Sequence, residues 1–182
     1  MFRFSLRMLM LACLVVVSAR AADDVVSAAH GTITKVDSAA KTITIKTKDG
    51  TEHTVHLVDK TVVHGAEATE SGAKDTTHGL KEGTEVVAHY TEKGGEKTAV
   101  EVYRVGEGGI KSMDGTVSKV GEDGKTVVVK AADGTEHTFA VAGKGTADTA
   151  KEIGKGSEKS AKVTVYYTEK AGKKIAHFFE KL

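Results

Sequence analysis

An internal duplication restricts this chain to folds in which one small module forms twice along the sequence. Residues 31–36 (GTITKV) return as residues 115–120 (GTVSKV), and residues 49–54 (DGTEHT) return unchanged as residues 133–138, both at an offset of 84. A third block, YTEK, occurs at position 90 and again 77 positions later. Matches of this length at nearly constant offsets indicate a duplicated structural unit.

We therefore predict two modules, residues 30–105 and residues 114–182, joined by the Gly-rich linker of residues 106–113 (GEGGIKSM). The second copy is seven residues shorter than the first between its DGTEHT and YTEK blocks. Because the linker is short and rich in glycine, we expect the modules to touch or to tilt about a limited hinge.

The local pattern of each module is that of β-strands. Residues 42–46 (TITIK) alternate apolar with polar β-branched side chains, which is typical of a half-buried strand. Residues 48–51 (KDGT) predict a tight hairpin, because Asp-Gly readily takes the positive φ angles of such a turn. Further strands are expected near Gly31 and at residues 51–57, 61–64, 85–91 and 97–105.

The predicted fold class is therefore all-β: two tandem small five-stranded OB-like or SH3-like barrels. The second copy departs from the first in its middle connection, residues 146–160. There Ala147, Ala150, Lys151 and Ile153 share one face of a short predicted helix, which Gly154 would end.

The order of motifs in the first copy resembles a known family. A Gly-x-Ile-x-x-Val-Asp strand is followed by KTITI, Asp-Gly-Thr, a Thr-Val-Val strand and GLKEGTEVV. This order resembles the small exported OB-like barrels of a bacterial family labelled a domain of unknown function. The resemblance covers residues 30–105 well and residues 114–182 less well, because the second copy lacks the Gly-Leu-x-x-Gly turn. It implies a fold and no catalytic residues.

Residues 1–21 have the layout of a secretory signal: a short positive segment, an apolar run, and small residues ending in the A-x-A pattern of Ala19 and Ala21. The apolar run is about ten residues long, too short for a bilayer that takes about 20. We predict cleavage after Ala21 and a periplasmic or secreted chain with no transmembrane span. Cys13, the single cysteine, leaves lipidation as the alternative, whereas cleavage after Ala21 leaves no thiol.

The composition excludes several classes of function. Cleavage removes Arg3, Arg7 and Arg20, so 23 of the 26 basic residues remain against 25 acidic ones, and the formal charge changes from +1 to −2. A near-neutral chain with few aromatic residues does not predict a nucleic-acid partner. It also lacks a G-x-S-x-G elbow and a phosphate-binding glycine loop. We expect no enzyme, but a binding or envelope structural module for an envelope protein, glycan or small ligand; the oligomeric state stays open.

Histidine is the most suggestive residue type, because neutral imidazole is a common transition-metal ligand. Six of the eight histidines lie in the first copy: His30, His53, His56, His64, His78 and His89. His53 and His56 cannot share an ion on a regular strand, since residues three apart face opposite sides. The alternative function is thus divalent transition-metal binding by the first repeat, and no other cofactor is expected. Its candidate ligands are His56, His64, His78 and His89, and the competing interpretation is ordinary surface histidine.

Four residues are shared by the two copies and are assigned structural roles. His53 and His137 share a strand face with apolar neighbours, so we predict that each caps its strand by hydrogen bonding to a loop carbonyl. A repeated ligand or proton-transfer site is the alternative for this pair. Tyr90 and Tyr167 begin the two YTEK blocks, which we interpret as solvated hairpin turns.

Overall fold

The computed structural model describes residues 26–65, 77, 79–155 and 161–182. The predicted signal peptide, with Ala19, Ala21 and Cys13, lies outside these residues, as does His78. Within the part of the chain that is described, no helix is long and apolar enough to cross a membrane.

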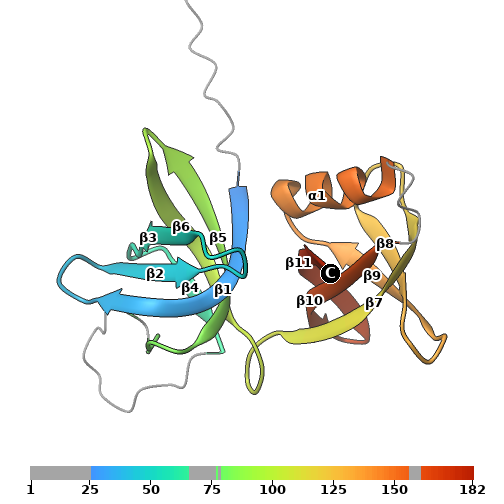
Figure 1. The fold of residues 1–182 in the computed structure, drawn as a ribbon, viewed down its shortest axis with the longest axis horizontal. Coiled ribbons are helices and arrows are strands. Elements are labelled where there is room, and N and C mark those ends of the chain that lie inside the picture. The colour runs from blue at the N-terminus through green and yellow to red at the C-terminus, as the bar shows by residue number, and fades with distance from the viewer. Residues whose placement is uncertain (1–25, 66–76, 78, 156–160) are drawn as a thin grey trace, which may run out of the picture.

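The first copy folds as a curled sheet of six strands (Figure 1). Their order is β3-β2-β1-β5-β6-β4, and β3 also pairs in parallel with β6, which brings the two sides of the sheet together. The strands are β1 (Val26–Asp37), β2 (Thr42–Lys46), β3 (Glu52–His56), β4 (Val62–His64), β5 (Glu85–Lys93) and β6 (Glu96–Arg104). The short strand β4 was itself expected, at residues 61–64, and with it the sheet has six strands where the predicted barrel had five.

The second copy is a closed barrel of five strands in the order β10-β11-β9-β8-β7, closed by parallel pairing of β9 with β11. Its elements are β7 (Lys111–Val120), β8 (Thr126–Lys130), β9 (Glu136–Val141), α1 (Lys144–Lys155), β10 (Lys162–Lys170) and β11 (Lys173–Lys181). The helix α1 follows β9, where the first copy has β4. The predicted fold class, two tandem small barrels with a short helix in the second, is confirmed.

A glycine opens each copy because β1 and β7 pass very close to the strand that follows. A Cβ atom on Gly31 would lie 2.2 Å from the carbonyl oxygen of Lys46, and one on Gly115 would lie 2.7 Å from that of Lys130. Both distances are well inside contact distance. The absence of a side chain therefore lets each strand bend across its barrel.

The repeated Asp-Gly hairpin forms as predicted. Gly50 and Gly134 have φ angles of 87° and 88°, in the region that glycine adopts without strain. In each turn the aspartate accepts a hydrogen bond from the backbone N–H two residues later, at 3.0 Å for Asp49 and 2.8 Å for Asp133. Both copies thus reverse the chain with the same Asp-Gly turn and the same aspartate hydrogen bond.

Helix α1 covers one end of the second barrel with the predicted face, on which Lys151 is half-buried. Its buried residues include Ala147, Ala150 and Ile153. The Thr146 hydroxyl donates a hydrogen bond of 2.9 Å to the carbonyl oxygen of His177 and so joins the start of the helix to β11. The helix runs one residue past Gly154, so the predicted end is wrong by one position. A Cβ at Gly154 would lie 2.9 Å from that of Val120, which explains the need for glycine there.

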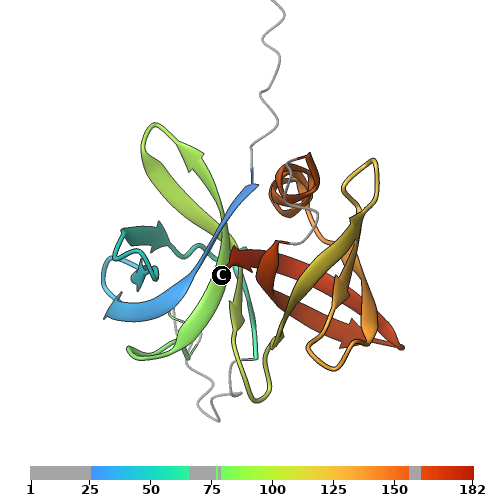
Figure 2. The ribbon, with the colours of Figure 1, turned by 45° about the vertical axis from the view of Figure 1, so that its right-hand side comes forward.

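The two barrels pack against each other through an apolar contact that we call the seam. It consists of Val87, Tyr103, Ile110 and Tyr166, with Val105 and Phe178 packed against them. Ile110 comes from the predicted linker and is fully buried, and β7 already begins at Lys111. Figure 2 shows the two barrels side by side with this connection below them. The linker is thus part of the contact between the barrels.

Candidate binding site between the barrels

Two of the histidines proposed as metal ligands lie together beside the seam. His64 on β4 is paired in register with Tyr103 on β6, and their rings stack at 4.3 Å between centroids. His89 on β5 is paired with Glu101 on β6, and its ring meets that of Tyr103 edge-on at 5.9 Å. The two imidazoles therefore flank one phenol ring.

The structure does not bring the other proposed ligands to this place. His56 lies at the end of β3, where its Nε2 is 3.6 Å from a carboxylate oxygen of Glu96 and its side chain is 40% exposed. His78 is outside the described residues. Among those that are described, no three His, Cys, Asp or Glu side chains are grouped so that they could hold one metal ion.

A third imidazole comes from the second barrel and was missed by the sequence reasoning. His177 on β11 is buried, its ring packs on Tyr103 at 4.3 Å, and it lies 6.1 Å from the ring of His89. Its Nε2 is hydrogen bonded to the Thr168 hydroxyl at 2.9 Å. The equivalent position of the first copy has no histidine, so comparison of the two copies did not mark His177 as a shared residue. The one available sign was an imidazole next to two phenylalanines in a buried strand.

We call His64, His89 and His177 the histidine cluster, and each has a buried ring nitrogen without a hydrogen-bond partner. These atoms are His64 Nε2, His89 Nε2 and His177 Nδ1. His64 Nε2 is 3.7 Å from Glu101 Oε1, which is an ion-pair distance but too long for a hydrogen bond. Buried polar atoms in native proteins are nearly always paired, so each unpaired one needs an explanation.

Burial favours the uncharged form of two members of this cluster, His89 and His177. Burial lowers the pKa of His89 against the opposing effect of Glu101. Burial, and then the neighbouring His89, lowers the pKa of His177 to about 4. Burial also raises the pKa of Tyr103, with the charge of Glu101 adding to the shift. The Tyr103 hydroxyl donates a 3.0 Å hydrogen bond to Glu101, the carboxylate beside the cluster.

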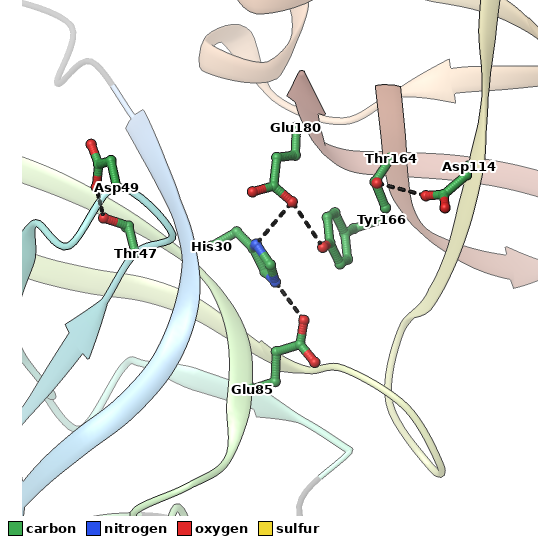
Figure 3. Close-up of polar contacts among 8 residues, drawn as sticks. All are labelled: His30, Thr47, Asp49, Glu85, Asp114, Thr164, Tyr166 and Glu180. Carbon is green, nitrogen blue, oxygen red and sulfur yellow. Dashed lines mark hydrogen bonds and ion pairs between the residues drawn. The ribbon is translucent and has the colours of Figure 1, made fainter. Parts of the chain in front are cut away.

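A second polar group joins the barrels through His30 (Figure 3). The His30 Nε2 atom is 2.7 Å from Glu85 Oε1 on the first barrel, and its Nδ1 is 3.5 Å from Glu180 Oε2 on the second. The Tyr166 hydroxyl donates to the same Glu180 oxygen at 3.3 Å, and the ring of His30 lies 4.2 Å from that of Tyr166. His30 therefore sits between two carboxylates from different barrels.

An open groove runs along this polar group. One part has a volume of about 580 Å³ and the adjoining part about 450 Å³, and both are lined by His30, Thr47, Lys48 and Glu180. Further lining residues include Asp49, His53 and Phe178 in the first part and Lys46, Glu85 and Tyr166 in the second. The groove thus presents carboxylates, ammonium groups and hydroxyls from both barrels.

The residues shared by the two copies meet at equivalent places in each barrel. Lys97 Nζ lies 3.0 Å from His53 Nδ1 and 5.5 Å from the centre of the Tyr90 ring. The second copy repeats this arrangement with Lys174, His137 and Tyr167, at 2.7 Å and 5.6 Å. The structure pairs each histidine with a lysine of the last strand rather than with the predicted loop carbonyl. The DGTEHT and YTEK blocks are thereby joined within each barrel.

Fold and site together define an all-β protein of two tandem small barrels with a histidine-rich contact between them. No family model and no curated protein matches the chain. Among solved structures the chain is similar to the crystal structure of Ag(I)CusF, with 16% identity over 43% of this chain and 96% of that chain, at a TM-score of 0.33. At that score the similarity carries no argument about the present protein.

Proposed function

We propose that this chain is an exported, non-catalytic binding module whose ligand occupies the groove between its two barrels. The observation that carries the proposal is that both barrels line the groove, with His30 held between Glu85 of the first and Glu180 of the second. Neither copy alone contains this site. Ligand sites commonly form where two domains meet, with a few polar groups that fix orientation.

The lining favours a small polar ligand with both hydrogen-bond donors and acceptors, such as a sugar or a short peptide. Glu85 and Glu180 accept hydrogen bonds, Lys46 and Lys48 donate them, and Thr47 does both. The mixed charges would pair poorly with a ligand of one sign. A long apolar ligand would have to cover several of these groups without replacing their bonds to water.

Export and membership of the OB-like family are part of the same proposal. The layout of residues 1–21 supports export to the periplasm or beyond, and the motif order of residues 30–105 supports the family. N-terminal sequencing of exported material should give a chain that begins at Ala22. A chain that still begins at Met1 would contradict the export proposal, and a lipid-modified Cys13 would contradict the cleavage site.

A panel of polar fragments (sugars, amino acids and dipeptides) tests the groove by ¹H–¹⁵N NMR on the chain without residues 1–21. Bound fragments should shift the amide signals of the groove, and Glu180→Gln should weaken their binding. Glu136→Gln, an exposed change at the start of β9, is the matched control and should have no effect. Fragment binding that clusters elsewhere, or no binding by any fragment, would contradict the proposed site.

The second candidate function is the histidine-based binding of a transition metal. The unpartnered nitrogens of His64 and His89 favour it. His56, however, is separate from them, and the imidazole that lies edge-on to His89 belongs to the second barrel. A metal site made by the first repeat alone therefore has less support than one shared between the barrels.

A further inference from the structure

The histidine cluster contains one pair of imidazoles that comes from different barrels and is nine-tenths buried. His89 on β5 and His177 on β11 are each 6% exposed, and their rings lie edge-on at 6.1 Å and 78°. His89 Nε2 and His177 Nδ1 are both buried without a hydrogen-bond partner. This pair is separate from the groove, which His30 lines and these two residues do not.

We propose that His89 and His177 bind one monovalent copper ion between the two barrels, through His89 Nε2 and His177 Nδ1. Two metal–nitrogen bonds of about 2 Å and two ring radii of about 1.1 Å put the centroids of two imidazoles on one ion at most about 6 Å apart. The observed 6.1 Å is at that limit. With the two unpartnered nitrogens turned toward a shared ion, this separation allows a straight nitrogen–metal–nitrogen arrangement, which a closed-shell d¹⁰ ion such as Cu⁺ accepts.

The same distance disfavours a tetrahedral ion such as Zn²⁺. Tetrahedral angles would require the two rings to approach by about 1 Å, with two more ligands. No group of three metal-binding side chains exists among the described residues, so the further protein ligands would have to come from rearrangement. A site of two imidazoles is complete for Cu⁺ and incomplete for Zn²⁺.

The surroundings also favour a single positive charge. Glu101 is the carboxylate whose charge acts on both His89 and His177. Glu101 is 39% exposed and lies beside the two buried rings, so its single charge balances a monovalent ion, whereas a divalent ion would keep one uncompensated charge next to them. Burying an uncompensated charge is strongly unfavourable, so these surroundings favour the monovalent ion at the His89–His177 pair.

The other nitrogen of His177 is placed as in known metal sites. Its Nε2 is 2.9 Å from the Thr168 hydroxyl, which can accept the Nε2–H and leave the lone pair on Nδ1 free. Such a hydrogen bond fixes the tautomer and the ring orientation of a ligating histidine. Tyr103 packs on the same ring at 4.3 Å and, with its hydroxyl bonded to Glu101, limits rotation of that ring.

The test uses the chain without residues 1–21, Ag⁺ as a redox-stable d¹⁰ probe, and Cu⁺ under anaerobic conditions against a competing chelator. We expect one ion per chain. Long-range ¹H–¹⁵N NMR should show His89 Nε2 and His177 Nδ1 shifting together at one equivalent, while the other histidine nitrogens do not. This readout needs no variant, so it does not depend on whether an altered seam still folds.

Two variants and two controls complete the test. His89→Gln and His177→Gln should each weaken Ag⁺ binding at least tenfold, and His56→Gln, an exposed histidine of the same barrel, should not. Glu180→Gln should leave Ag⁺ binding unchanged, which separates this site from the groove. The proposal is overturned if Ag⁺ and Cu⁺ do not bind, if binding persists unchanged in both glutamine variants, or if Zn²⁺ binds more tightly than Ag⁺.

Discussion

Replacing Ile110 with alanine should uncouple the two barrels more than it weakens either of them. Ile110 is fully buried and packs with Val87 and Tyr103 of the first copy and Tyr166 of the second. The change removes the equivalent of three methylene groups, about 2.4 kcal/mol at about 0.8 kcal/mol each. With a cavity left in the seam, the loss rises to about 3 kcal/mol, within the range for such substitutions.

Hydrogen exchange and urea unfolding measure this loss in different parts of the molecule. The backbone N–H of residue 110 donates a 2.8 Å hydrogen bond to the carbonyl oxygen of Arg104, so it reports on opening of the seam. A loss of about 3 kcal/mol should speed its exchange by roughly 100-fold. Amides of β2 and β8, inside the two barrels, should change much less. Urea unfolding should separate into two transitions, one for each barrel.

Val62→Ala is the matched control, because Val62 is 48% exposed on β4 and its loss should change stability by no more than about 0.5 kcal/mol. Ile43→Ala in the first core should destabilise only the first barrel. The reasoning is refuted if Ile110→Ala lowers stability no more than the control. It is refuted equally if the amides of both barrel cores accelerate as much as that of residue 110.

Two further predictions concern features that both copies share. Gly31→Ala should destabilise the first barrel by about 3 kcal/mol, because the new Cβ meets the Lys46 carbonyl oxygen. Gly50→Ala should cost about 1 kcal/mol, from its positive φ alone. Equal urea midpoints for the two variants would contradict this difference. Lys97→Met should raise the pKa of His53, which burial and then the Lys97 charge hold below its usual value, as NMR titration of the imidazole can show. In the unchanged protein the lowered pKa of His53 means that the unfolded chain binds a proton more readily than the folded one. The free energy of unfolding therefore decreases as the pH falls below about 6.5. Lys97→Met should reduce this loss of stability at low pH. Identical profiles of stability against pH for the variant and the unchanged protein would contradict the role given to the Lys97 charge.

The strands and turns could be predicted because their causes are local. The alternation in residues 42–46 and the Asp49–Gly50 turn depend on near neighbours in the sequence. The duplication repeats both patterns in the second copy and so gives independent support for each. The helix face of Ala147, Ala150, Lys151 and Ile153 was found in the same way. The end of the helix was misplaced because a glycine is needed at position 154 for close contact with the distant Val120, and not to terminate the helix.

The site could be predicted only in part, because it depends on how the copies pack. His64 and His89 were named as candidates, but nothing along the chain shows that both would face Tyr103. His177 and Glu180 face the first barrel from β11, and strand periodicity does not reveal which outer face meets another domain. His56 was grouped with them on the expectation that the loop after it folds back, but it lies at the end of β3 beside Glu96 instead.

The different middle sections of the two copies also bear on how the chain avoids misfolding. Two modules with the same DGTEHT hairpin on one chain could exchange strands while they fold, a known failure of tandem repeats. α1 closes the second barrel with Ile153 and bonds to its own β11 through Thr146, whereas the first barrel buries Leu80 in its core. A hairpin that paired with the other copy would pack against α1 in place of Leu80, or against Leu80 in place of α1. We therefore expect the divergence of these sections to disfavour exchange of strands between the two copies during folding.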